Sequence, residues 1–291
     1  MSRITFITSP RAAAHALGKD RVSREVYLVD VALTDDVVES VRSKKSSQMI
    51  FAVDHHPSSV LEELDGIKII EEGRSAAGVL HKYLKASPHL KKLVAIADQL
   101  EYCDTDVLHD ILKRHGQQKV NDEARVLDFS WRLNIEDDEF RIIASQHLSE
   151  GAWPSQIGAI KRRYLQVVNE NRWPKAIARV KSGLQVRDKV GIFQCHEKNR
   201  SLYGFGTRAL VEVAHRWGCS YALMLNDRKE NCSVSIRGMD QKGMDVGQFV
   251  EDFVTRHGMD GGGHPTSAGA RIPLPVETKF VDEFVSASVT R

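Results

Sequence analysis

The chain has 291 residues, of which 42% are hydrophobic and 27% are charged, and this length predicts two domains. Its 41 Lys and Arg nearly balance its 39 Asp and Glu. This balance argues against a protein that binds long nucleic acid through its net charge. The four cysteines form no CxxC pair, and no long apolar run follows the opening residues. We therefore expect reduced thiols, no membrane span and a cytoplasmic protein.

The first part of the chain alternates apolar runs with helical patterns. We expect strands over 3–8, 24–31, 48–56 and 66–72, and helices over 10–18, 34–43, 75–85 and 89–101. Strands of continuous apolar residues separated by helices indicate a parallel sheet covered on both faces. Ligands bind outside the carboxyl ends of the strands in such sheets, and Asp30 and Asp54 both fall at such ends.

The pattern changes after about residue 136. Residues 137–180 look helical and charged, which predicts a connector, and strand-like runs follow over 183–195, 221–227 and 231–238. The glycine-rich stretch 258–275 comes near the end of the chain. We therefore predict an α/β protein with a parallel-sheet domain over 1–135, a helical connector over 136–180 and a smaller mixed α/β domain over 181–291.

The triplet Asp54-His55-His56 ends a strand that is otherwise apolar. Carboxylate oxygen combined with imidazole nitrogen suits manganese, iron or zinc better than calcium. The plainer interpretation is that Asp54 caps a turn and that both histidines are surface residues. Asp30 at a neighbouring strand end favours a metal site instead, and Asp98 in "AIADQLE" is a further candidate.

Six stretches, in order along the chain, together resemble one family. They are "VYLVDVALTDD", "VDHHPSS", "GRSAAGVL", "AIADQLE", "SVSIRG" and "GGGHPTSAGARI". The chain is similar over nearly its whole length to the DHH phosphoesterases of the DHHA1 subfamily, which include RecJ-type exonucleases, oligoribonucleases and cyclic-dinucleotide phosphodiesterases. The resemblance implies a DHH metal-binding domain, a DHHA1 substrate-binding domain and an active-site cleft between them.

The resemblance also implies roles for particular residues. Asp30, His55 and Asp98 would bind divalent metal, His56 would lie near the reacting phosphate, and Asp54 would hold an imidazole in place. In the second domain, a guanidinium and a glycine-rich loop would clamp the substrate. These residues are Arg237, Gly261, Gly262, Gly263 and His264. Taken alone, the three glycines are also compatible with an ordinary tight turn.

The sequence departs from the family at its first motif, usually HxxxDxDG. Aligning the opening strands puts Ser9 at the histidine position, Ala13 at the first aspartate and His15 at the second. The family's site has two metal positions. At one of them only Asp30 would remain as a ligand. The other could be completed by His15, Asp30, His55 and Asp98. We therefore expect one Mn²⁺ rather than two. A surface histidine is the alternative interpretation of His15.

The leading functional hypothesis is a metal-dependent phosphodiesterase that hydrolyses short oligonucleotides, single-stranded ends or linear or cyclic dinucleotides to nucleoside monophosphates. The alternative is a catalytically degenerate DHH protein that binds nucleotide, single-stranded nucleic acid or a protein partner. A pyrophosphatase-like member is disfavoured, because those enzymes carry a different carboxyl-terminal domain. The expected partner is a short oligonucleotide or dinucleotide, and a homodimer remains open.

Overall fold

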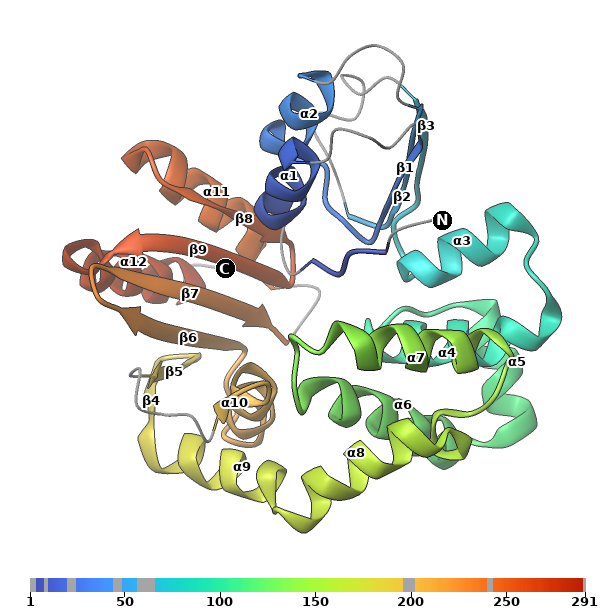
Figure 1. The fold of residues 1–291 in the computed structure, drawn as a ribbon. Coiled ribbons are helices and arrows are strands. Elements are labelled where there is room, and N and C mark those ends of the chain that lie inside the picture. Colours follow the sequence, from blue (N-terminus) through green and yellow to red (C-terminus); the bar gives the residue numbers. More distant parts are fainter. Residues whose placement is uncertain are drawn as a thin grey trace. The chain divides into compact units, whose positions relative to one another are not determined.

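The chain divides into two compact units, Met1–Tyr164 and Leu165–Arg291, which we call the amino-terminal and carboxyl-terminal units. The boundary falls inside the segment expected to be a connector. The computed structural model describes residues 4–7, 10–19, 25–43, 49–56, 66–195, 202–239 and 243–289 (Figure 1). None of the helices in these ranges combines the length and apolar character needed to cross a membrane.

The amino-terminal unit contains a small sheet and a larger set of helices. Its strands are β1 (Glu25–Val29), β2 (Met49–Asp54) and β3 (Ile67–Ile70). Its helices are α1 (Pro10–Lys19), α2 (Asp35–Arg42), α3 (Ala76–Leu84), α4 (Lys91–Leu100), α5 (Asp106–His115), α6 (Gln117–Arg132) and α7 (Asp138–Ser149), with short 3-10 turns at Pro88–Leu90 and Pro154–Gln156. Helix α8 (Gly158–Asn169) crosses the unit boundary.

The sheet of the amino-terminal unit is parallel, with the order β1-β2-β3, as the apolar runs predict. Helices α1 and α2 cover one face, where Leu28, Ile50 and Ala52 join the same buried cluster as both helices (Figure 1). The opposite face is covered only in part, because Tyr27 is 63% exposed and stacks on Phe51 of the neighbouring strand. The expectation of full cover on both faces is therefore wrong for the described residues.

The opening strand is also a wrong prediction. Residues 4–7 form no strand, although their apolar sequence resembles one. Phe6 lies edge-on to Trp131 of α6, with ring centroids 6.1 Å apart, and the Arg141 guanidinium lies 5.2 Å from the Phe6 ring centroid. These contacts hold the segment against the helices of the same unit instead of pairing it with the sheet.

Asp98 joins three helices of the amino-terminal unit. It lies in α4 and is fully buried. Its Oδ1 accepts hydrogen bonds from the backbone N–H and the hydroxyl of Ser75, at 3.1 and 2.6 Å, and its Oδ2 accepts one from the Thr105 hydroxyl at 2.6 Å. Ser75 caps α3 and Thr105 caps α5. One carboxylate therefore fixes the starts of two helices against a third.

The carboxyl-terminal unit contains a second sheet covered by helices. Its strands are β4 (Leu184–Arg187), β5 (Val190–Cys195), β6 (Tyr221–Arg228), β7 (Asn231–Gly238), β8 (Asp260–His264) and β9 (Ser267–Pro273). Its helices are α9 (Arg172–Gly183), α10 (Gly206–Arg216), α11 (Val246–His257) and α12 (Glu277–Val289), with a 3-10 turn at Leu274–Val276.

This second sheet is mixed, with the order β4-β5-β6-β7-β9-β8 and one parallel pair, β5 with β6. Helices α11 and α12 cover one face and pack a cluster of phenylalanines that includes Phe253, Phe280 and Phe284. Helices α9 and α10 lie on the other face (Figure 1). The predicted α/β class, with one parallel and one mixed sheet, is confirmed.

The "GGGH" segment forms a strand rather than the expected loop. It makes up most of β8, and the turn of the hairpin is Pro265-Thr266. A side chain at Gly263 would meet the Ser267 carbonyl oxygen at 2.2 Å, and one at Gly261 would meet the Ala270 side chain at 2.9 Å. These two glycines are required by close packing, whereas the Cβ position at Gly262 is open.

We predict that Asp98→Ala destabilises the protein by about 2–4 kcal/mol, because it leaves the buried Ser75 and Thr105 groups without their acceptor. The matched control is Asp104→Ala, which removes an exposed carboxylate paired with His109 and should cost less than about 1 kcal/mol. Urea unfolding measures both changes. Equal destabilisation by the two substitutions contradicts the role of Asp98 in joining the helices.

Candidate functional site

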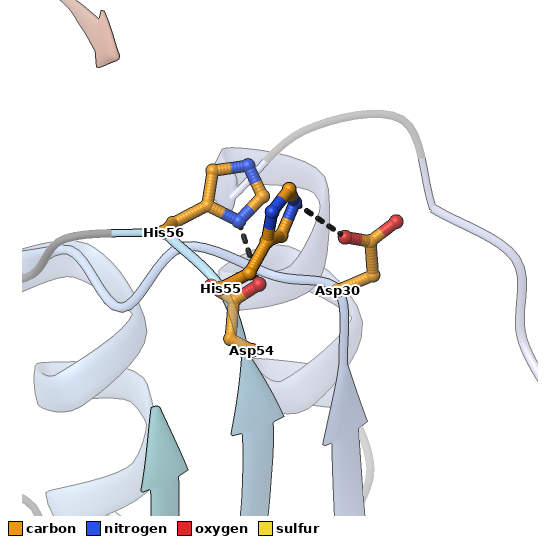
Figure 2. A group of neighbouring side chains, drawn as sticks. All are labelled: Asp30, Asp54, His55 and His56. Carbon is orange, nitrogen blue, oxygen red and sulfur yellow. Dashed lines mark hydrogen bonds and ion pairs between the residues drawn. The ribbon is translucent and has the colours of Figure 1, made fainter. Parts of the chain in front are cut away.

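The candidate site lies at the carboxyl ends of β1 and β2. Asp30 follows β1, and its backbone N–H donates a 3.0 Å hydrogen bond to the Val53 carbonyl of β2. Asp54 is the last residue of β2, and His55 and His56 come directly after it. Because the two strands are parallel neighbours, all four side chains project from one edge of the sheet (Figure 2).

Asp30 has an unusual backbone conformation for a residue with a side chain. Its φ is +59°, in the left-handed region that aspartate tolerates better than most residues. Its side chain is 61% exposed, in contrast to Asp54 in the same group, which is 1% exposed. Residues held in such conformations cluster at functional sites, where the surrounding structure maintains them.

The four side chains offer ligand atoms that all lie within 4.8 Å of one another. His55 Nε2 is 3.4 Å from Asp30 Oδ1, and His56 Nδ1 is 2.6 Å from Asp54 Oδ1 (Figure 2). Ligand bonds of about 2.0–2.2 Å place two ligand atoms of one ion about 3.0–3.5 Å apart. The Asp30–His55 pair therefore fits joint metal binding, whereas the Asp54–His56 pair is a hydrogen bond.

Asp54 has one satisfied and one unsatisfied oxygen. Oδ1 accepts the hydrogen bond from His56, whereas the buried Oδ2 has no hydrogen-bond partner among the described residues. A buried carboxylate oxygen without a partner is costly, and a cation beside it would compensate the charge. This orphaned atom and the mixed carboxylate–imidazole donors fit a divalent metal ion of the manganese or zinc type.

The electrostatics of His55 depend on its acidic neighbours. The hydrogen bond to Asp30 raises the pKa of His55 above its ordinary value, with smaller contributions in the same direction from the charges of Asp30, Asp54 and Glu101, and burial opposes them. A proton therefore competes with a metal ion for the Nε2 atom more strongly than at an isolated histidine. Glu101, at the end of α4, is a nearby carboxylate that the sequence analysis did not identify.

Two residues predicted as ligands lie outside this group. Asp98 is not among the clustered side chains, and both of its oxygens accept hydrogen bonds from Ser75 and Thr105. His15 lies on the exposed side of α1, beside a shallow depression between α1 and α2. Ala13 is buried in α1, and Ser9 lies outside the described residues. The roles of Asp98 and His15 as ligands stay predictions without geometric support.

The predicted substrate residues meet at one end of the second sheet. Arg237 of β7 and His264 of β8 both pair with Ser267 of β9, which lies between them. Residues directly opposite each other on antiparallel strands point to the same face, so these three side chains share a face. Arg237 and His264 are then two strand spacings apart, about 10 Å. Gly262 lies two residues before His264 on the same strand.

The carboxyl-terminal unit contains a second group of metal-type side chains that the sequence analysis missed. Asp227, Cys232 and Glu277 bring ligand atoms within 4.8 Å of one another. The Gln194 amide donates hydrogen bonds to both carboxylates, at 2.9–3.1 Å to Asp227 and 2.9 Å to Glu277. Burial and the nearby Glu277 raise the pKa of the Cys232 thiol, which favours the protonated form. These hydrogen bonds explain why the two carboxylates lie close together without a metal ion between them.

Comparisons with known proteins agree with this fold. Residues 210–289 match the DHHA1 domain family. A pGpG-specific phosphodiesterase from Vibrio cholerae is 12% identical, with a TM-score of 0.54 over 96% of this chain and 95% of its own. The DHH domain of a member of the s1p family of ribosomal proteins is 15% identical, with a TM-score of 0.66 over 90% of this chain and 68% of its own.

RecJ from Thermus thermophilus, in complex with Mn²⁺, is 14% identical, with a TM-score of 0.57 over 97% of this chain and 47% of its own. The chain therefore spans about half the length of that RecJ. No curated protein sequence matches. Residues 210–289 therefore match a DHHA1 domain, and the chain shares its fold along nearly its whole length with these three structures.

Proposed function

We propose that the protein is a metal-dependent phosphodiesterase that hydrolyses short oligonucleotides, single-stranded ends or linear or cyclic dinucleotides to nucleoside monophosphates. The observation that carries this proposal is the convergence of Asp30, Asp54, His55 and His56 within 4.8 Å at one sheet edge. Two of the similar structures, a pGpG-specific phosphodiesterase and a manganese-bound RecJ, support the substrate class and the choice of Mn²⁺.

In this proposal Asp30 and His55 would hold the metal ion, and the buried Asp54 carboxylate would add negative charge beside it. A divalent ion at such a site would polarise a phosphoryl oxygen and neutralise its charge. Water would attack the phosphorus atom while the bond from phosphorus to the leaving nucleoside oxygen breaks, and His56 would move the proton from the attacking water to that oxygen. The Asp54 carboxylate accepts a hydrogen bond from His56 Nδ1, which leaves Nε2 as the atom that takes up and returns this proton.

The carboxyl-terminal unit would bind the substrate. Arg237 supplies a planar, permanently charged guanidinium that suits a phosphate, and His264 adds a second side chain on the same sheet face. The open position at Gly262 lets a nucleotide approach the backbone of β8. Gly261 and Gly263 support this surface indirectly, through the packing of the hairpin.

The second candidate function is that of a family member that binds nucleotide, single-stranded nucleic acid or a protein partner without hydrolysing it. The first-motif alignment expected from the sequence favours it. That alignment puts Ala13 at the first aspartate position, and Ala13 is buried in α1. The experiment that separates the two functions is release of mononucleotide from the dinucleotide pApA, with and without Mn²⁺. Manganese-dependent release supports the enzyme, and its absence at saturating substrate supports the binding protein.

We predict that the metal-stripped protein binds about one Mn²⁺ per chain, measured by isothermal titration calorimetry. His55→Ala should weaken this binding more than tenfold, because it removes the imidazole that faces Asp30. His15→Ala is the control and should match the wild type, since His15 lies outside the group. Absence of manganese binding rejects the enzymatic proposal, and two tightly bound ions indicate ligands beyond this group.

We predict that Arg237→Ala weakens binding of a nucleoside monophosphate about tenfold or more, because it removes a charged phosphate contact that contributes about 1.5–3 kcal/mol. Manganese binding should not change. The control is Arg271→Ala, an exposed arginine four residues beyond Ser267 on the same strand and face, about 13 Å away. If both variants bind the nucleotide equally well, Arg237 is not part of the substrate site.

A further inference from the structure

One face of the amino-terminal sheet carries a group of apolar side chains that we call the sheet patch. The strand register places Tyr27 of β1 opposite Phe51 of β2, and Phe51 opposite Ile67 of β3, so these three side chains share a face. Val29 and Met49 lie on the same face, two residues away along β1 and β2, and complete the patch. Helices α1 and α2 pack on the other face (Figure 1).

The sheet patch is open to solvent. Tyr27 is 63% exposed and Met49 is 52% exposed, and the corresponding values for Val29 and Ile67 are 42% and 40%. Together these four residues expose roughly 300–400 Å² of largely apolar surface, which is the size of the largest patch on a typical monomer. Patches of this size often mark interaction sites.

The outer edge of β1 borders this patch. Strand β1 is an end strand of the sheet, and within the described ranges no strand pairs with its outer side. The Asp30 N–H points toward β2, where it meets the Val53 carbonyl, and backbone groups alternate in direction along a strand. The N–H and C=O groups of Glu25, Tyr27 and Val29 therefore point outward. An apolar strand with such an edge is a template for pairing with another chain.

The opposite edge of the sheet is less suited to pairing. Strand β3 has four residues, of which Lys68 carries a charge and only Ile67 is exposed. Short strands and lysine side chains are two means by which proteins protect a sheet edge from other chains. The edge available for association is therefore that of β1.

We infer that the outer edge of β1 and the sheet patch form the interface of a homodimer, in which two β1 strands pair antiparallel about a two-fold axis at Tyr27. The two sheets then join into one continuous sheet with a shared apolar face. The rings of Tyr27 and Phe51, stacked with centroids 4.7 Å apart, continue across the axis into the same pair of the second copy. This inference does not depend on the proposed function.

The residue pattern of β1 favours a second copy as the occupant. The antiparallel pairing sets Glu25, the one charged residue of β1, opposite Val29 of the partner subunit, so no like charges meet. Tyrosine, which is enriched in interface cores, lies at the centre. The two patches and the paired backbone would bury on the order of 1,000 Å², which is the size of weak, reversible interfaces. We therefore expect a dimer that dissociates in the micromolar range.

The two candidate metal sites stay separate in this dimer. Asp30 lies three residues beyond Tyr27, so the antiparallel pairing places the two copies of Asp30 about 20 Å apart. Each site is then complete within one chain. Manganese binding per chain should therefore be the same in the monomer and in the dimer.

Sedimentation equilibrium over about 1–300 µM protein measures the association. The wild type should show a reversible equilibrium between monomer and dimer. Tyr27→Lys should weaken it more than tenfold, because it sets two like charges opposite each other at the axis. The matched control is Tyr83→Lys, which changes an exposed tyrosine of α3 and should dimerise as the wild type does. The urea midpoint of each dilute variant should equal that of the wild type, which shows that the fold is kept.

A disulfide tests the strand pairing itself. Residues of a hydrogen-bonded antiparallel pair have Cα atoms about 5.5 Å apart, which a disulfide can span. Tyr27→Cys should therefore give a covalent dimer under mild oxidation. Val29→Cys should not, because its two copies would lie about 14 Å apart. The wild type, whose own cysteines are all free, is the blank.

Each other result overturns the inference. A wild type that stays monomeric at the highest concentration assigns the patch to a different partner. Association that is equally strong in Tyr27→Lys excludes the sheet patch from the interface. Equal cross-linking by the two cysteine variants, or cross-linking by neither, excludes the two-fold pairing at Tyr27. Open-ended assemblies larger than a dimer exclude a closed interface at β1.

Discussion

The parallel pairing of β1 with β2 is the constraint on which the candidate site depends. The hydrogen bond from the Asp30 N–H to the Val53 carbonyl continues this pairing one residue beyond β1, and it places Asp30 beside the turn that carries the two histidines. Val26 and Leu28, with Ile50 and Ala52 opposite them, pack α1 and α2 beneath the strands. Core packing and ligand placement are thus two results of the same strand register.

The sequence predicted the parts of this arrangement that follow from apolar periodicity. The apolar runs that form β1, β2 and β3 were located correctly, and the polar residues at the ends of β1 and β2 were expected to converge. Asp30, Asp54, His55 and His56 do lie together. Strand direction and strand order suffice for this result, because in a parallel sheet all carboxyl ends fall on one edge.

Features set by tertiary contacts were not predictable in the same way. The opening segment has a strand-like composition, yet Phe6 packs on Trp131 and Arg141, which come from far along the chain. Asp98 resembles a ligand in its motif, but its oxygens are taken by Ser75 and Thr105, and neither contact is visible from the motif alone.

The left-handed backbone at Asp30 makes this position selective for reasons separate from metal chemistry. Asparagine and aspartate share a short polar side chain that tolerates a φ of +59°, whereas glutamate does not. Charge and conformation can therefore be varied independently. Asparagine keeps the backbone geometry and removes the charge, and glutamate keeps the charge but adds conformational strain on the order of 1 kcal/mol. Backbone conformation and ligand chemistry thus each restrict the side chain at this position, and only the second restriction acts through the metal.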